Sequence, residues 1–115
     1  MSPGKRGDRV APPAEPGHWV LRFGSTEAAK GWEELCRQAP GNTRRAWEEI
    51  GANPKPFPSS ERHHQLKGKE LSAVNGLEQW QYEVTGGGRI WYLVDVKKMT
   101  VWISRAGTGH PNATD

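Results

Sequence analysis

The sequence predicts an α+β domain in which a two-helix hairpin packs on a twisted antiparallel sheet of about four strands, in the order β-α-α-β-β-β. Apolar residues recur at helical spacing in two successive stretches between residues 25 and 53. Apolar and polar residues alternate, as in half-buried strands, at residues 18–23 and again from residue 80 onward. Only 34% of the residues are hydrophobic, but six are tryptophans, each able to bury roughly 150–250 Å², so a core can form.

The N-terminal residues 1–17 differ in composition from the rest of the chain. They contain four prolines and three glycines, and Val10 is their only sizeable aliphatic residue. Such a segment buries too little apolar surface to offset the entropy lost on ordering. We therefore expect a disordered leader over residues 1–17 and a single domain over residues 18–115.

The first strand is expected at residues 18–23, followed by two helices. Ser25 is expected to cap the first helix, which runs to about Ala39. Asn42 is the expected cap of the second helix, which ends within residues 51–54. The residues at helical spacing are Ala28, Trp32, Leu35, Cys36 and Ala39 in the first helix and Ala46, Trp47 and Ile50 in the second. Both tryptophans should fill the interface between the helices and the sheet.

The second half of the chain is expected to form a loop and then antiparallel strands. Residues 54–62 carry three prolines, which lack a backbone donor and restrict the preceding residue, so they predict a loop. Residues 63–68 predict a short edge strand or an extended lead-in. Residues 80–84 and 89–96 alternate on either side of a triple glycine and predict a hairpin, and the last strand is expected at 100–105.

Composition excludes several classes of protein. A single cysteine, Cys36, cannot form a disulfide or a cysteine-based zinc site within the chain. No apolar run approaches the roughly 20 residues of a membrane helix, and no secretory signal is evident, so we expect a cytoplasmic protein without a membrane partner. No ligand-spacing motif links the histidines and acidic residues, so we expect no metal or other cofactor. The net charge of +3 fits an anionic partner without requiring one.

Four motifs occur in a characteristic order after the two helices. They are LKG at residues 66–68, WQYEV at 80–84, GRIWYLVD at 88–95 and AGTGH at 106–110. With these motifs, the region from about residue 18 to residue 111 resembles the RelE/ParE superfamily of bacterial toxins, most closely its ParE-like branch. The resemblance implies a RelE-like microbial ribonuclease-type fold and a type II toxin-antitoxin system, in which a cognate antitoxin holds the toxin inactive in a hetero-oligomer.

The resemblance implies two different activities. RelE-like members are endoribonucleases that cut messenger RNA in the ribosomal A site, whereas ParE members inhibit DNA gyrase without catalysing a reaction. We expect a metal-independent endoribonuclease that binds and cleaves ribosome-bound mRNA and thereby inhibits translation and growth. A gyrase inhibitor is the alternative, and a module that has lost its activity is a third reading.

Cleavage of RNA without a metal needs a base for the 2′-hydroxyl proton, cations for the charged transition state and an acid for the leaving oxygen. Arg89 matches the superfamily's phosphate-contacting arginine, and its planar guanidinium suits a phosphate. The alternative is a surface residue that pairs with Glu83 across the hairpin. His110 follows Gly109 where superfamily ribonucleases often carry an acid or phosphate-binding residue; the alternative is a histidine in a disordered tail.

His64 and Glu83 are the candidates for the remaining proton transfers. The resemblance places His64, two residues before Leu66, where some ribosome-dependent members have a glutamate base, so His64 would be that base. The alternative is an ordinary surface histidine. Glu83 stands where RelE carries a lysine, so this chain departs from the strongly basic site. Glu83 is then either the base of a carboxylate–imidazole pair or a cross-strand partner of Arg89.

The expected RNA- and phosphate-binding residues are Arg62, His63, Lys67, Lys69 and Trp91. The basic residues cluster around the histidines, which is typical either of a solvated loop or of a phosphate site. Neighbouring residues on a strand point to opposite faces, so His63 and His64 cannot both face one cleft if the strand is regular. Trp91 shares a strand face with Arg89, where it would form a wall of the site or contact the antitoxin.

Overall fold

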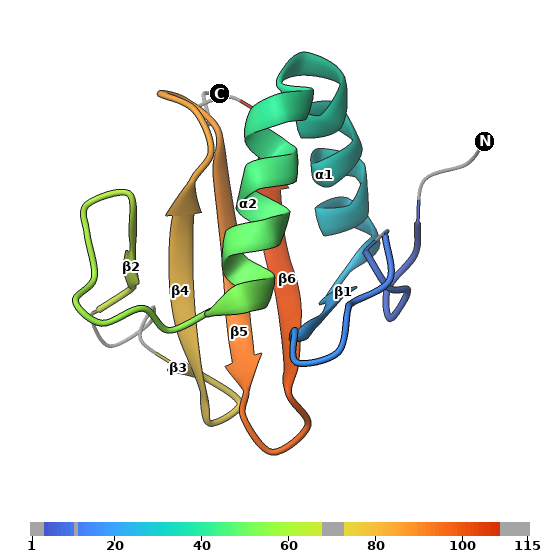
Figure 1. Cartoon of the computed structure of the whole chain (residues 1–115). Helices are drawn as coiled ribbons and strands as arrows, with labels where there is room; N and C mark the ends of the chain where they lie inside the picture. The colour runs from blue at the N-terminus through green and yellow to red at the C-terminus, as the bar shows by residue number, and fades with distance from the viewer. Residues whose placement is uncertain (1–3, 11, 68–72, 109–115) are drawn as a thin grey trace.

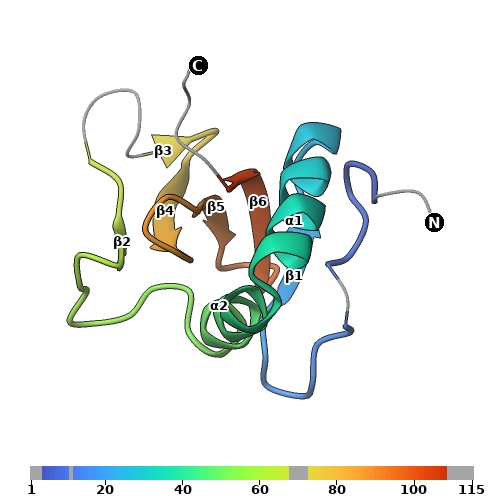
Figure 2. The ribbon, with the colours of Figure 1, turned by 90° about the horizontal axis from the view of Figure 1, so that it is seen from above.

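The structure, a computed structural model, describes residues 4–10, 12–67 and 73–108. Two helices, α1 (Thr26–Gln38) and α2 (Pro40–Ala52), lie on one face of a six-stranded sheet (Figures 1 and 2). The strands are β1 (Val20–Phe23), β2 (His63–Gln65), β3 (Ala73–Val74), β4 (Leu77–Glu83), β5 (Arg89–Asp95) and β6 (Thr100–Gly107). Their order is β1-β6-β5-β4-β2, and β3 pairs with β4. The α+β prediction is confirmed, with more strands than the four expected.

The sheet is mostly, but not entirely, antiparallel. β1 runs parallel to β6, with Val20 opposite Thr100 and Phe23 opposite Ile103. This corrects the prediction of an antiparallel sheet. Tight turns force antiparallel pairing on β4, β5 and β6, but β1 and β6 come from opposite ends of the chain, so no local turn sets their relative direction.

The described part of residues 1–17 differs from the disordered leader that its composition predicts. The amide nitrogen of Gly7 lies 2.7 Å from the carbonyl oxygen of Phe23, and that of Val10 lies 2.8 Å from the carbonyl oxygen of Leu21. Val10 itself is only 2% exposed and belongs to the core. The segment therefore covers the outer edge of β1, where unpaired backbone groups would otherwise face solvent.

The two helices begin in different ways. The hydroxyl of Ser25 accepts a hydrogen bond of 3.0 Å from the Ala28 amide, which confirms the predicted cap of α1. α2 instead begins at Pro40 without a side-chain cap, because proline has no amide to satisfy and suits the first helical position. Asn42, the expected cap, donates to the Val84 carbonyl over 3.1 Å and so ties α2 to the sheet.

The core lies between the helices and the sheet. Trp32 and Trp47 are buried there, as expected, together with Trp80 of β4 and with Ile90 and Tyr92 of β5. In the described chain, neither helix is long and apolar enough to cross a membrane.

The regular alternation of β5 places its odd-numbered residues on the face of the sheet away from the helices. β4 and β5 form the predicted hairpin, in which Glu83 lies opposite Arg89. Between β5 and β6 the register shifts after Trp91, so that Arg105 lies opposite Trp91 and Ile103 opposite Tyr92. Residues 54–62 form a loop without helix or strand, as predicted, and lead into the edge strand β2.

Candidate nucleic-acid interface

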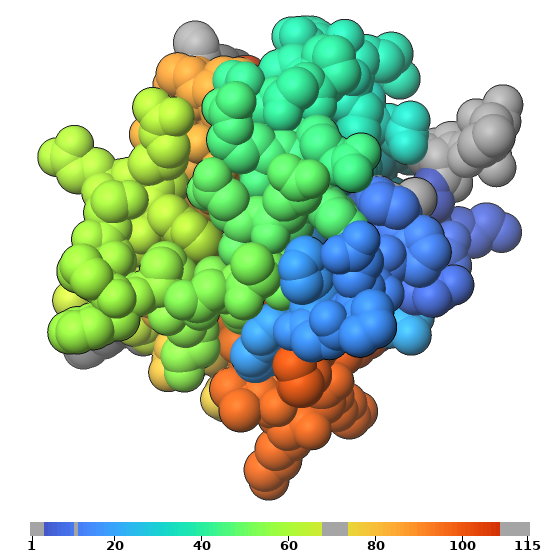
Figure 3. Space-filling view, viewed as in Figure 1, coloured from blue at the N-terminus to red at the C-terminus, as the bar shows by residue number. Residues whose placement is uncertain are grey.

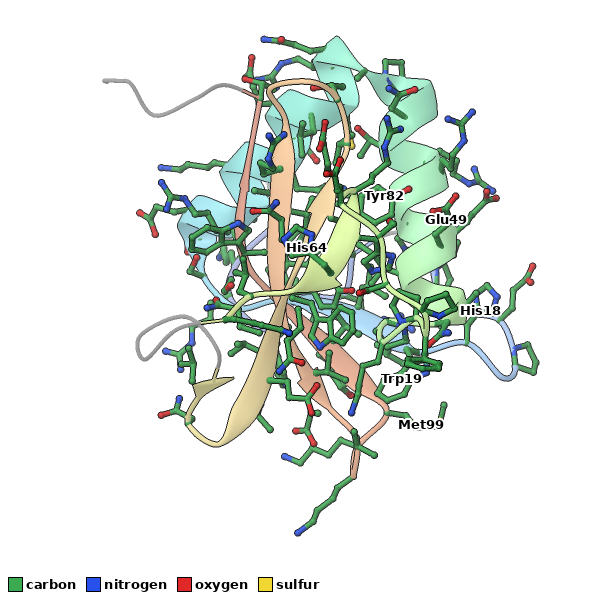
Figure 4. The ribbon with its side chains drawn as sticks, turned by 90° about the vertical axis from the view of Figure 1, so that its left-hand side faces the viewer. His18, Trp19, Glu49, His64, Tyr82 and Met99 are labelled. Atoms are coloured by element: carbon green, nitrogen blue, oxygen red, sulfur yellow. The ribbon has the colours of Figure 1, made fainter. Side chains whose placement is uncertain are left out.

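Four side chains form a line across the face of the sheet that the helices leave uncovered. His64 of β2 lies opposite Gln81 of β4, Gln81 opposite Trp91 of β5, and Trp91 opposite Arg105 of β6. We call these four residues the cross-sheet row. In Figure 4, Tyr82 and Glu49 lie toward α2, whereas His64 lies on the other side of β2.

Contacts within the cross-sheet row hold Trp91 in place. The indole nitrogen of Trp91 donates to Gln81 Oε1 over 2.7 Å. The guanidinium carbon of Arg105 lies 5.2 Å from the centre of the Trp91 ring, within the range of a cation–π interaction. The hydroxyl of Ser104 donates to the Trp91 carbonyl over 3.2 Å. The row therefore presents an aromatic ring with a cation over it, and aromatic and cationic groups together suit a nucleic-acid strand.

Glu83 and Arg89 occupy the next position along the same face. Arg89 Nη1 lies 3.2 Å from the carbonyl oxygens of Thr85 and Gly88 and 3.3 Å from that of Gly86, so the arginine braces the β4–β5 turn. Within the described ranges Glu83 forms no ion pair with Arg89, although the two are register partners. The expected alternative, a cross-strand ion pair between them, is therefore wrong.

The ring of His64 is oriented by the preceding loop. Its Nδ1 lies 2.9 Å from the Glu61 carbonyl oxygen and 3.2 Å from that of Ser60. Carbonyls only accept hydrogen bonds, so Nδ1 donates to them and Nε2 is the ring nitrogen left for another partner. His64 is opposite Gln81, which makes Glu83 its diagonal neighbour, at a typical spacing of about 7–8 Å.

His63 points the other way, into the core. Its side chain is only 8% exposed, and its ring lies edge-on to those of Trp80, Tyr82 and Tyr92. The Tyr92 hydroxyl donates to the Pro54 carbonyl over 2.6 Å, so it accepts its bond from His63 Nε2. His63 is thus a structural residue, which corrects the expectation that it binds phosphate.

Burial changes the pKa values around His63. Loss of hydration lowers the pKa of His63 to about 4, and nearby Glu49 offsets only part of this effect. The pKa of the Tyr82 hydroxyl is raised, first by burial and then by its 2.8 Å bond to Glu49. Burial also raises the pKa of Tyr92. All three groups are therefore neutral at neutral pH, as a core requires.

The lowered pKa of His63 predicts a loss of stability in acid. The unfolded chain binds this proton below pH 6.5 and the folded chain only near pH 4, so stability is complete above 6.5 and falls as the pH drops toward 4. We expect the free energy of unfolding to be lower by about 2 kcal/mol at pH 4.5 than at pH 7.5, as measured by urea unfolding. His63→Gln should lack this component, whereas His64→Gln should retain it. Equal pH dependence in wild type and His63→Gln would contradict the assignment.

The other expected site residues lie in different places. Arg62 is exposed, and its carbonyl accepts a 2.7 Å bond from the Glu83 amide, which places it beside the cross-sheet row. Lys67 lines a cavity next to β2 together with His64. Lys69 and His110 lie outside the described residues. Among the residues that the structure describes, no three His, Cys, Asp or Glu side chains are grouped so as to hold a metal ion.

Gln81 and Arg105 are the members of the cross-sheet row that the sequence analysis did not name, and for Arg105 the sequence pattern indicates the opposite face. Strict alternation from the buried Ile103 would turn Arg105 toward the core. The register shift inserts Ser104 as an extra residue and turns Arg105 to the face of Trp91. A bulge of this kind leaves no signal in the polar and apolar pattern.

Comparison with known proteins gives no relative. No family model matches the chain, and neither the curated proteins nor the solved structures include a match.

Proposed function

We propose that this chain is a type II toxin of the RelE/ParE kind, an endoribonuclease that cleaves ribosome-bound messenger RNA without a metal. The observation that carries the proposal is the gathering of His64, Glu83 and Arg89 on one uncovered face of the sheet. The motif order in the sequence supports the same family. A cognate antitoxin would keep the toxin inactive by covering this face.

The proton transfers follow from the atoms that the two side chains present. A carboxylate oxygen accepts a proton and an imidazole nitrogen can donate one, so we assign the base to Glu83 and the acid to His64. Glu83 takes the proton of the RNA 2′-hydroxyl, and the 2′-oxygen attacks the adjacent phosphorus. The bond from phosphorus to the 5′-oxygen breaks, and His64 Nε2 donates the proton that this oxygen takes up. The products are a 2′,3′-cyclic phosphate and a 5′-hydroxyl.

Arginines on the same face supply the positive charge that the transition state needs. The hydrogen bonds between Arg89 and the described residues use Nη1, so Nη2 and Nε are available to bind a phosphate. Arg105, held over the Trp91 ring, provides a second cation on this face. A positive, partly aromatic surface is suited to a single RNA strand.

Mapping of 5′ ends on cellular messenger RNA after a short induction tests this proposal. We expect wild type to produce new ends at codon boundaries and Glu83→Gln and Arg89→Ala to produce few or none. Arg37→Ala is the matched control, because Arg37 is an exposed arginine on α1 that pairs with Glu34. Intact transcripts together with a DNA-damage response would contradict the proposal and favour inhibition of gyrase.

A further inference from the structure

A cavity of about 700 Å³ lies at the free edge of the sheet, between the 54–62 loop and β2. Figure 3 shows this loop and β2 as the yellow-green margin on the left of the molecule. The cavity is lined by Lys55, Pro56, Phe57, Ser59, His64, Gln65, Leu66, Lys67, Glu78 and Trp80. His64 belongs both to this cavity and to the cross-sheet row, so the two features adjoin.

Phe57 is the most unusual side chain in this lining. It is 96% exposed, more than any other large apolar side chain that the structure describes. The loop that carries it is anchored at both ends, by the Tyr92–Pro54 bond of 2.6 Å and by backbone bonds between Ser60 and His63. An exposed ring on an anchored loop adds nothing to the core, but it can stack on a ligand with little further loss of entropy.

The charges around the cavity favour an anionic ligand. Lys55 and Lys67 contribute amino groups to the lining, and Glu78 is the one acidic residue among the lining residues that the structure describes. Glu78 is already engaged, because Lys55 Nζ lies 3.4 Å from one of its oxygens and the Trp80 indole nitrogen 3.1 Å from the other. Lys67 forms no ion pair with any residue that the structure describes, so it is available for a phosphate.

We propose that this cavity binds one unstacked nucleobase of the RNA, with Phe57 stacked on the base and Lys67 on a neighbouring phosphate. The inference rests on the proposed function, because His64 would place this base next to the phosphate that is cleaved. Stacking on an aromatic side chain is sequence-tolerant, so this site orients the strand without fixing its sequence.

The test measures the affinity for an eight-nucleotide unstructured RNA in which every ribose is 2′-O-methylated. Fluorescence anisotropy reports the fraction of RNA bound. Methylation blocks the attacking hydroxyl, so binding is measured apart from cleavage. We expect Phe57→Ala to weaken binding about tenfold, and Phe57→Tyr to bind like wild type. Met99→Ala, another exposed apolar residue, is the matched control and should leave binding unchanged.

A scan with abasic nucleotides locates the base. At one position, removal of the base should weaken wild-type binding as much as Phe57→Ala does, and the two changes together should cost no more than either alone. Unchanged RNA binding by Phe57→Ala would overturn the proposal, and so would a loss confined to the binding of an antitoxin peptide. Phe57-dependent binding without cleavage of ribosome-bound, all-ribose mRNA would instead support the base site and overturn the proposed ribonuclease.

Discussion

His64→Ala is expected to lower the rate of RNA cleavage by about 10²–10⁴-fold, the usual contribution of a general acid. His64 contacts the Ser60 and Glu61 carbonyls at the protein surface, so its removal should leave stability nearly unchanged. Single-turnover cleavage of a defined mRNA gives the rate, and thermal unfolding gives the stability. A variant that unfolds, or that cleaves at the wild-type rate, would contradict this assignment.

A modified substrate separates the acid from the base. When sulfur replaces the 5′-oxygen at the cleaved bond, the leaving thiolate needs no proton. We expect this substrate to restore cleavage by His64→Ala nearly to the wild-type rate, but not cleavage by Glu83→Gln, which still lacks the base. Rescue of Glu83→Gln instead would reverse the two roles.

Gly31→Ala is expected to destabilise the fold by at least about 3 kcal/mol, beyond the usual cost of an added methyl group. A β-carbon at Gly31 would lie 1.8 Å from the Ala106 carbonyl oxygen and 2.6 Å from its carbon. Both are backbone atoms of β6, so no side-chain rotation relieves the contact and α1 would have to move away from the sheet.

Gly41→Ala provides the matched control for this change. Gly41 lies in the first turn of α2, and a β-carbon there meets nothing within 4 Å. Alanine forms helix better than glycine, so this variant should be as stable as wild type or more stable by up to about 1 kcal/mol. Urea unfolding of both variants tests the argument, and similar stabilities would show that α1 does not pack on β6 as closely as described.

The sequence predicts most of the interface because strand alternation decides which side chains share a face. The pattern in residues 80–96 is regular, and the alternation alone places Glu83, Arg89 and Trp91 on one side of the hairpin. The opposite orientations of His63 and His64 follow from the same rule. The tryptophans in the helices are also predicted correctly, because helical spacing directs them to the sheet.

The remaining features depend on contacts between distant parts of the chain. The parallel pairing of β1 with β6 and the ordered segment along β1 involve no local turn. The orientation of His64 depends on two loop carbonyls, and that of Arg105 on a bulge. None of these leaves a periodic signal in the sequence, so pattern analysis misses them.

The chemistry of the RNA ends tests the central claim most directly. Purified protein is incubated with ribosomes programmed with a defined mRNA, and both ends at each break are identified. We expect a 2′,3′-cyclic phosphate upstream and a 5′-hydroxyl downstream, and no cleavage when the ribose at the break lacks its 2′-hydroxyl. An intact transcript, together with inhibition of supercoiling by DNA gyrase at the same protein concentration, would contradict the claim.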